Sequence, residues 1–197
     1  MFCKNAHVTR IRFTVALLAC SLLSLAASAA AAQTAFTLDG KPINPFPGPS
    51  GKPIVLIFVR TDCPISNRYA PVLRGLFDSK YHRLATFWLV YPDKKTAPQQ
   101  IRAHVREFQF GIDALRDPDH VLVKRAGATI TPEAAVFDSS GNLLYRGRID
   151  NLYVDAGRAR PAATTHELKD AIESAIYGKT PMPVSASAVG CYISDLE

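Results

Sequence analysis

One stretch of the sequence decides the fold: residues 54–67, which read IVLIFVRTDCPISN. Its first six residues are apolar and rich in branched or aromatic side chains, a pattern typical of a central strand that is buried on both faces. Cys63 and Pro64 follow, and apolar residues recur at helical spacing from Ile65 onward. Proline suits the first turn of a helix, because the N–H groups of that turn have no partner within the helix. The stretch therefore predicts a buried strand followed by a helix, with a cysteine at the junction.

This position makes Cys63 a candidate nucleophile. A sulfur at the start of a helix faces unpaired N–H groups and the positive end of the helix dipole, and both favour the thiolate. Ser66 lies one turn later, where its hydroxyl can donate a hydrogen bond to the sulfur, whereas the negative charge of Asp62 opposes ionisation. An inert, buried thiol is the structural alternative. We expect a thiol that is more acidic than a free cysteine if the helix contribution dominates.

The flanking sequence continues an alternation of strands and helices. A second buried strand is predicted at residues 85–91, and a helix kinked by Pro71 lies between it and the first strand. Strand, helix and strand in succession favour parallel pairing. The other predicted elements are a strand at 35–38, helices at 98–108 and 119–125, a hairpin of strands 133–138 and 143–149, and a last helix that opens with a Thr164–Glu167 capping box and ends near Gly178. These elements predict an α/β fold with a central mixed sheet flanked by helices.

Residues 1–32 have the three-part form of a secretory signal peptide. A basic start is followed by an apolar run at 13–27 and by small residues up to Ala32, the expected cleavage position. The apolar run is shorter than the ~20 residues that a membrane-spanning helix needs. We therefore expect an exported protein, periplasmic or secreted, without a stable membrane anchor. A retained anchor and lipidation at Cys20 are the alternatives.

The rest of the chain is predicted to form one domain at 33–178 and a C-terminal tail at 179–197. Removal of the leader takes away two of the four cysteines and leaves Cys63 and Cys191. Disulfides persist in the compartments that exported proteins reach, so this pair is a candidate for thiol chemistry or for one structural disulfide.

Composition excludes several classes of protein. The 197 residues are 48% hydrophobic and 20% charged, which does not fit collagen-like, coiled-coil or mainly disordered chains. The net charge of +6 includes three basic residues of the leader, so 20 basic residues face 17 acidic ones in the remainder. This small excess gives no case for nucleic acid as a partner.

Taken together, the motifs resemble the thioredoxin superfamily. The resemblance is carried by the strand before Cys63-Pro64-Ile65-Ser66, the helix containing Pro71, and Thr131-Pro132 ahead of the predicted hairpin. In that family the active cysteine begins the first helix and a cis-proline loop lies beside it, a loop that Thr131-Pro132 matches here. The resemblance covers roughly residues 36–178. Within the superfamily, the chain looks most like exported redoxins of the alkyl hydroperoxide reductase and thiol-specific antioxidant group.

The resemblance implies an oxidoreductase that acts on protein thiols or disulfides, or on peroxides, with an electron donor that the sequence does not identify and with no cofactor. The chain departs from the family's dithiol motif, because Ser66 stands where that motif has its second cysteine. It also departs from peroxiredoxins, since Thr61 lies two rather than three residues before Cys63 and Phe58 replaces their proline. Cys63 therefore acts alone or needs a distant partner, and Cys191 is the candidate resolving thiol. A permanent Cys63–Cys191 disulfide is the alternative.

Two other classes of function stay open. Copper chaperones of the Sco type share the fold, and Cys63, Cys191 and His120 are the ligands that a cuprous ion would find here. His120 is otherwise expected to be a solvated loop side chain. A binding module without catalysis is the third class. The preferred interpretation is a thiol-dependent oxidoreductase whose site comprises Cys63, Cys191, Ser66, Thr131 and Pro132, with Thr131-Pro132 presenting the substrate backbone.

Overall fold

A computed structural model describes residues 34–46, 51–178, 185–194 and 196 of the chain. The predicted leader and its cleavage position lie outside these residues. Within the described part of the chain, no helix is both long enough and apolar enough to cross a membrane.

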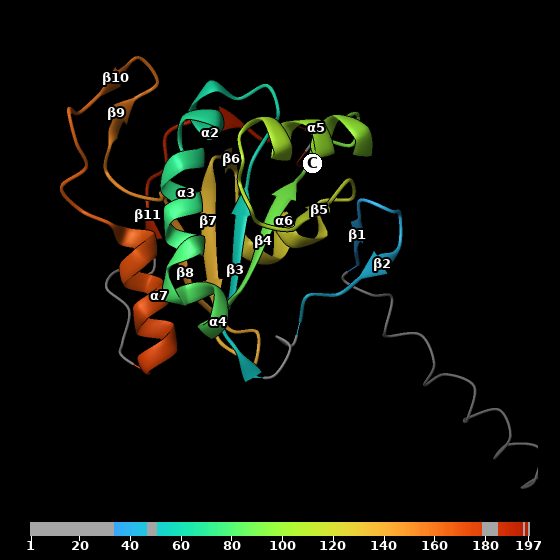
Figure 1. Cartoon of the computed structure of the whole chain (residues 1–197), viewed down its shortest axis with the longest axis horizontal. Coiled ribbons are helices and arrows are strands. Elements are labelled where there is room, and N and C mark those ends of the chain that lie inside the picture. Colours follow the sequence, from blue (N-terminus) through green and yellow to red (C-terminus); the bar gives the residue numbers. More distant parts are fainter. Residues whose placement is uncertain (1–33, 47–50, 179–184, 195, 197) are drawn as a thin grey trace, which may run out of the picture. The chain divides into compact units, whose positions relative to one another are not determined.

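An eight-stranded mixed sheet forms the centre of the described fold (Figure 1). In spatial order its strands are β11 (Ser185–Ala186), β8 (Leu143–Gly147), β7 (Glu133–Phe137), β3 (Ile54–Phe58), β4 (Thr86–Tyr91), β5 (Ala114–Arg116), β1 (Ala35–Thr37) and β2 (Pro42–Ile43). β3 pairs in parallel with β4 and antiparallel with β7, so that Ile57 lies between Leu89 and Ala134. All five residues of β3 are buried, which confirms the predicted central strand.

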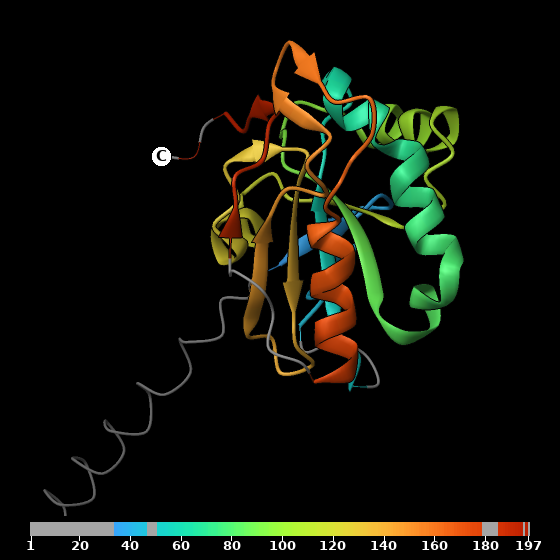
Figure 2. The ribbon, with the colours of Figure 1, turned by 90° about the vertical axis from the view of Figure 1, so that its left-hand side faces the viewer.

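The helices lie on both faces of this sheet, as Figure 2 shows. In chain order they are α2 (Pro64–Arg68), α3 (Ala70–Leu76), an irregular turn η2 (Phe77–Tyr81), α4 (His82–Leu84), α5 (Pro98–Glu107), α6 (Val121–Ala126) and α7 (Glu167–Tyr177). α3, α5 and α7 pack with the side of β3 that carries Val55 and Ile57, and α6 packs with the opposite side. Each fully buried aliphatic side chain of β3 stabilises the fold by about 1.5–3 kcal/mol. α2, whose N-cap is Cys63, therefore follows a strand that is buried along its whole length.

The helix expected between the first two buried strands is divided in two. α2 ends at Arg68, Tyr69 caps both segments, and Pro71 lies in the first turn of α3. Proline has no N–H to bond to the preceding turn, so the break just ahead of it agrees with the predicted kink.

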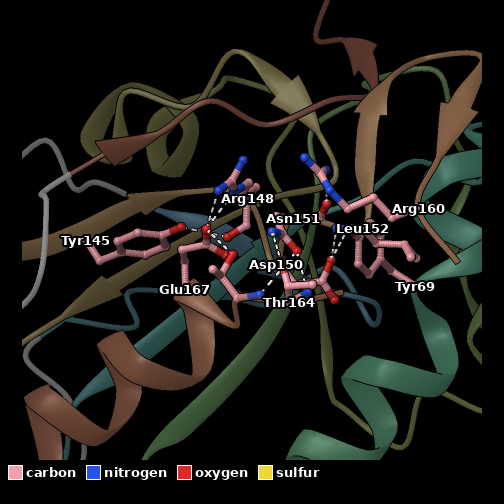
Figure 3. A network of polar contacts seen from close by, with 10 residues as sticks. Tyr69, Tyr145, Arg148, Asp150, Asn151, Leu152, Arg160, Thr164 and Glu167 are labelled. Carbon is pink, nitrogen blue, oxygen red and sulfur yellow. Dashed lines mark hydrogen bonds and ion pairs between the residues drawn. The ribbon is translucent and has the colours of Figure 1, made fainter. Parts of the chain in front are cut away.

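The predicted capping box of the last helix is wrong. α7 begins at Glu167, and His166 precedes it without a capping side-chain bond. The Thr164 N–H instead bonds to the side chain of Asn151, 2.7 Å away, and the Glu167 carboxylate binds the Arg148 guanidinium (Figure 3). Tertiary partners thus take the groups that a local cap would have used.

The helix predicted at 119–125 begins later, at Val121. His120 adopts a left-handed backbone conformation with φ 56°, and the Asp117 carboxylate accepts hydrogen bonds from the N–H groups of Val121 and Val123. Asp117 is fully buried, so the start of α6 is fixed by an internal carboxylate.

Two further ladders lie outside the large sheet. β9 (Tyr153–Asp155) pairs with β10 (Arg158–Ala159), and β6 (Ile130–Thr131) pairs with β12 (Cys191–Tyr192). In the second ladder, β12 belongs to the predicted tail, which Figure 2 shows in red beside the yellow β6 of the domain. The described part of the tail is therefore joined to the domain by backbone pairing.

Candidate thiol site

Cys63 occupies the position that the sequence indicates. It is the N-cap of α2, with an extended backbone conformation, and Pro64 begins the helix. Its side chain is completely buried, and its thiol donates a hydrogen bond to the carbonyl oxygen of Thr131, 3.1 Å from Sγ. The end of β3 and the start of α2 therefore place the sulfur directly against the Thr131-Pro132 loop.

The Thr131-Pro132 loop brings the second cysteine to the same place. The Thr131-Pro132 peptide bond is cis, and Cys191 lies opposite Thr131 in the antiparallel pairing of β6 with β12. The Thr131 hydroxyl donates to the carbonyl oxygen of Cys191 at 3.2 Å. Both cysteines are free thiols, and each shifts the pKa of the other. All five predicted site residues, Cys63, Ser66, Thr131, Pro132 and Cys191, meet in this region.

The surroundings of Cys63 favour its ionised form. Burial opposes ionisation and is the largest single influence, but the Cys191 thiol, the Ser66 hydroxyl and N–H, and the Thr131 side chain act against it, and the pKa of Cys63 falls below its ordinary value. The Ser66 hydroxyl is buried and, among the described residues, has no hydrogen bond of standard geometry in the thiol state. The Ser66 hydroxyl is therefore available to donate a hydrogen bond to the sulfur of Cys63 when that sulfur is ionised.

Cys191 shifts in the opposite direction. Burial, then the hydrogen bond to Cys63 and the charge on Cys63, raise the pKa of Cys191 to about 11. When one proton is shared by the two thiols, it therefore resides on Cys191 and the charge resides on Cys63. The two sulfurs therefore differ electrostatically: Cys63 favours the thiolate and Cys191 favours the thiol.

A partly buried chain of hydrogen bonds supports the loop before Cys63. The Tyr91 hydroxyl contacts His104 Nδ1 at 2.8 Å, and His104 Nε2 contacts the side-chain oxygen of Asn67 at 2.7 Å. The Asn67 amide in turn donates to the carbonyl oxygen of Thr61 at 3.4 Å. Burial lowers the pKa of His104. The sequence placed His104 on a helix but gave no sign of its partners, Tyr91 of β4 and Asn67 of α2.

A second network holds the break between α2 and α3. The Tyr69 hydroxyl donates to Asp150 at 2.6 Å, and the same carboxylate oxygen accepts the N–H of Leu152 (Figure 3). Arg160 donates to the backbone oxygen of Asn151 in the same segment. The long connection from β8 to α7 thereby fixes the helix segment that follows Cys63.

Two residues that sequence reasoning missed hold the tail in place. Arg60 donates to the carbonyl oxygen of Tyr192 at 3.1 Å and pairs with Asp62 at 2.8 Å. Gly190 lies so close to Thr131 that an added Cβ would overlap the Thr131 carbonyl oxygen. The alternation of Val189, Cys191 and Ile193 with other residues is a strand pattern that could have revealed this segment.

His120 does not join the two cysteines. Its side chain is buried rather than solvated, contrary to expectation, and Nε2 contacts the carbonyl oxygen of Pro92 at 3.0 Å. In the described residues, no group of three or more His, Cys, Asp or Glu side chains is placed to hold a metal ion. The ligand set Cys63, Cys191 and His120 expected of a copper chaperone is therefore not assembled.

Comparison with known proteins shows likeness at the level of structure. No protein-family model matches the sequence, and no curated protein matches it. A hypothetical protein from Sinorhizobium meliloti aligns with a TM-score of 0.66 at 18% identity, over 81% of this chain and 88% of that one. An uncharacterized conserved protein from Geobacillus kaustophilus aligns with a TM-score of 0.67 at 18% identity, over 81% and 86% of the two chains.

A third solved structure has a described activity. A secreted disulfide oxidoreductase from Mycobacterium tuberculosis, homologous to DsbE of E. coli, aligns with a TM-score of 0.52 at 22% identity, over 72% of this chain and 94% of that one. The central mixed sheet flanked by helices agrees with these likenesses. The chain has a thioredoxin-like fold.

Proposed function

We propose that this protein is a thiol–disulfide oxidoreductase in which Cys63 is the nucleophile and Cys191 is the resolving thiol. One observation carries the proposal: two cysteines far apart in the sequence are free thiols that both lie against Thr131 of a cis-proline loop. The described activity of the mycobacterial structural neighbour agrees with this class of reaction.

The chemistry proceeds in two displacements. The Cys63 thiolate attacks one sulfur of a substrate disulfide, so a Cys63–substrate disulfide forms and the other substrate sulfur leaves as a thiolate. Cys191, after losing its proton, then attacks Cys63 Sγ and releases the second substrate thiolate. The protein ends with a Cys63–Cys191 disulfide, and the substrate has gained two electrons. A dithiol donor returns the protein to its reduced form by the reverse exchange.

The electrostatics suit Cys191 to the second step. Besides burial, the hydrogen bond and the charge of Cys63 raise the pKa of Cys191. Both of these influences disappear once Cys63 is bonded to the substrate, because its sulfur then carries no charge. Cys191 therefore ionises more readily when its attack is needed. In this proposal, the Thr131-Pro132 loop presents the backbone of the substrate polypeptide to Cys63.

Peroxide reduction, as in the alkyl hydroperoxide reductase and thiol-specific antioxidant group, is the second candidate. The complete burial of Cys63 favours it, since a peroxide is small enough to reach a sulfur from which a polypeptide is excluded. The thiolate would attack one peroxide oxygen, release an alkoxide or hydroxide and become a sulfenic acid, and the Cys191 thiol would then condense with it to form the disulfide and release water.

Two serine variants test these proposals. Cys63→Ser is expected to abolish reduction of a chromogenic aromatic disulfide, whereas Cys191→Ser is expected to stop at the first step and accumulate the Cys63–substrate disulfide, visible by mass spectrometry. Consumption of hydrogen peroxide, followed in parallel, separates the two candidate reactions. If Cys63→Ser retains the activity of the unchanged protein toward both substrates, the proposed function is wrong.

We also propose that the protein is exported and loses residues 1–32. The basic, apolar and small-residue segments of this leader support the proposal. The test is the N-terminal sequence of protein recovered from the exported fraction of cells that express the full chain. It is expected to begin at Gln33, and a product that starts at Met1 would contradict cleavage.

A further inference from the structure

The tail occupies the backbone edge of the thiol site. β12 lies antiparallel to β6, with Cys191 opposite Thr131 and Tyr192 opposite Ile130. The N–H of Ile193 donates to the carbonyl oxygen of Thr129 at 3.0 Å, which extends the pairing by one residue. An extended segment of the chain itself thus fills the edge next to Cys63.

The side chains of this segment alternate between the protein and solvent. Val189 and Cys191 pack against the core on one side of the sheet, and Ile193, 6% exposed, packs against the core on the other side. Tyr192, between them, is 79% exposed. Gly190 lies against Thr131, where a Cβ has no room. The positions of the segment therefore differ in what they require: an at least partly buried side chain at Val189, Cys191 and Ile193, no side chain at Gly190, and no particular side chain at Tyr192.

Cys63 is closed to large molecules in the structure in which the segment lies beside it. The Cys63 side chain has no exposed surface while the tail is paired, although the nucleophile of a disulfide exchange with a polypeptide must be reached by a second chain. The closure rests on a short ladder of two paired residues, reinforced by the bond from Arg60 to the Tyr192 carbonyl oxygen. So short a strand is a contact that another strand can replace.

We propose that residues 189–193 are a tethered competing strand, which excludes partner polypeptides from Cys63 until a strand with the same pattern displaces it. The pattern is an aliphatic residue, glycine, cysteine, any residue, and a second aliphatic residue. The proposal rests on the proposed function and adds to it the kind of partner segment that the site accepts. Backbone pairing supplies the attraction, and the glycine and the second aliphatic residue supply the selectivity.

Access to Cys63 is the quantity that tests the proposal. The full chain is reduced, the reductant is removed, and alkylation of Cys63 is followed by peptide mass spectrometry with two reagents: iodoacetamide and a maleimide attached to a polyethylene glycol polymer. The ratio of the two rates is compared between variants, so that a changed thiolate fraction cancels. This measurement needs no redox turnover.

Gly190→Ala is the displacing variant. The added Cβ overlaps the Thr131 carbonyl oxygen, so the tail is expected to detach and the polymer-to-iodoacetamide ratio to rise by about tenfold or more, as the usual cost of an overpacked site implies. The matched control is Gly75→Ala in α3, whose added Cβ meets nothing within 4 Å. Its ratio is expected to equal that of the unchanged protein.

A second variant separates detachment of the tail from misfolding of the domain. Ile193→Asp places a carboxylate where an aliphatic side chain is buried, and it is expected to raise the ratio like Gly190→Ala while circular dichroism shows the domain still folded. If the unchanged protein is labelled by the polymer reagent as readily as these folded variants, the tail does not exclude large molecules and the proposal is overturned.

A peptide tests the required pattern. A synthetic peptide with the sequence of residues 187–194, with serine in place of its cysteine, is added to the Gly190→Ala protein. It is expected to restore protection of Cys63 from the polymer reagent, whereas the same peptide with alanine in place of its glycine is not. Equal protection by the two peptides would overturn the pattern. A Cys63 that resists iodoacetamide in every variant would instead overturn the proposed function, so the two failures are distinguishable.

Discussion

Cys63 and Cys191 are held by regions of very different construction. Cys63 follows β3, whose five residues are all buried and paired on both sides, and two hydrogen-bond networks support the helix it begins. Cys191 lies in a strand of two residues, attached through backbone bonds, one arginine and one isoleucine. The difference fits the proposed division of roles, in which Cys63 is the fixed nucleophile and Cys191 the resolving thiol on a replaceable strand.

The largest expected effect concerns the fixed region. Leu56→Ala leaves a cavity in the central strand and is expected to lower the free energy of unfolding by about 2–5 kcal/mol. Chemical denaturation measures this change. Val72→Ala, at a side chain that is 41% exposed, serves as the comparison and should stay within about 0.5 kcal/mol of the unchanged protein.

The corresponding change in the tail should act locally. Ile193→Ala removes an equally aliphatic side chain, but the tail can detach while the domain stays folded, so the loss of global stability is expected to be smaller than for Leu56→Ala. Hydrogen exchange should show faster exchange of the Ile193 amide, with the amides of β3 unchanged. Equal losses of global stability in the two variants would remove the distinction between the regions.

The third prediction concerns the electrostatic link between the regions. Cys191→Ala removes the strongest of the donors that lower the pKa of Cys63, so that pKa is expected to rise. Alkylation of Cys63 by iodoacetamide as a function of pH measures it, and the half-maximal rate should move to higher pH. Cys191→Ser keeps a hydroxyl donor and should move it less. A shift to lower pH in the alanine variant would contradict the assigned donor role.

The smallest effect is expected at the surface beside the site. Asp62→Asn breaks an exposed ion pair with Arg60 and should change the free energy of unfolding by less than about 1 kcal/mol. It also removes a negative charge that raises the pKa of Cys191, so that pKa should fall slightly. Titration of Cys191 in the Cys63→Ser background checks the direction after correction for the loss of Cys63. A large loss of stability would show that the fixed region depends on this pair.

The two regions also differ in how far the sequence predicted them. The β3–α2 junction was predictable because its determinants are consecutive: an apolar run, a cysteine and a proline. The Thr131-Pro132 loop came from resemblance, and the structure places it beside Cys63 as expected. The networks of Asp150 and His104 were not predictable, because their partners are brought together only by the complete fold.

The tail shows why local signals mislead when tertiary contacts decide. The distance from Gly178 to Cys191 along the chain showed only that Cys191 could reach Cys63, not where it pairs. The register is set by the pairing of Cys191 with Thr131 and by the lack of room for any side chain at Gly190. The Thr164–Glu167 capping box failed for a similar reason, since Asn151 and Arg148 compete for the same groups.

The end strands of the large sheet have a consequence for behaviour at high protein concentration. Its two outermost strands, β11 and β2, contain only two residues each, and β11 belongs to the same tail as Cys191. Ala186 approaches Gly147 so closely that no Cβ fits there, which seals the outer side of β8. If the tail leaves as a unit, β8 presents unpaired backbone groups to other molecules, which favours association of the protein at high concentration.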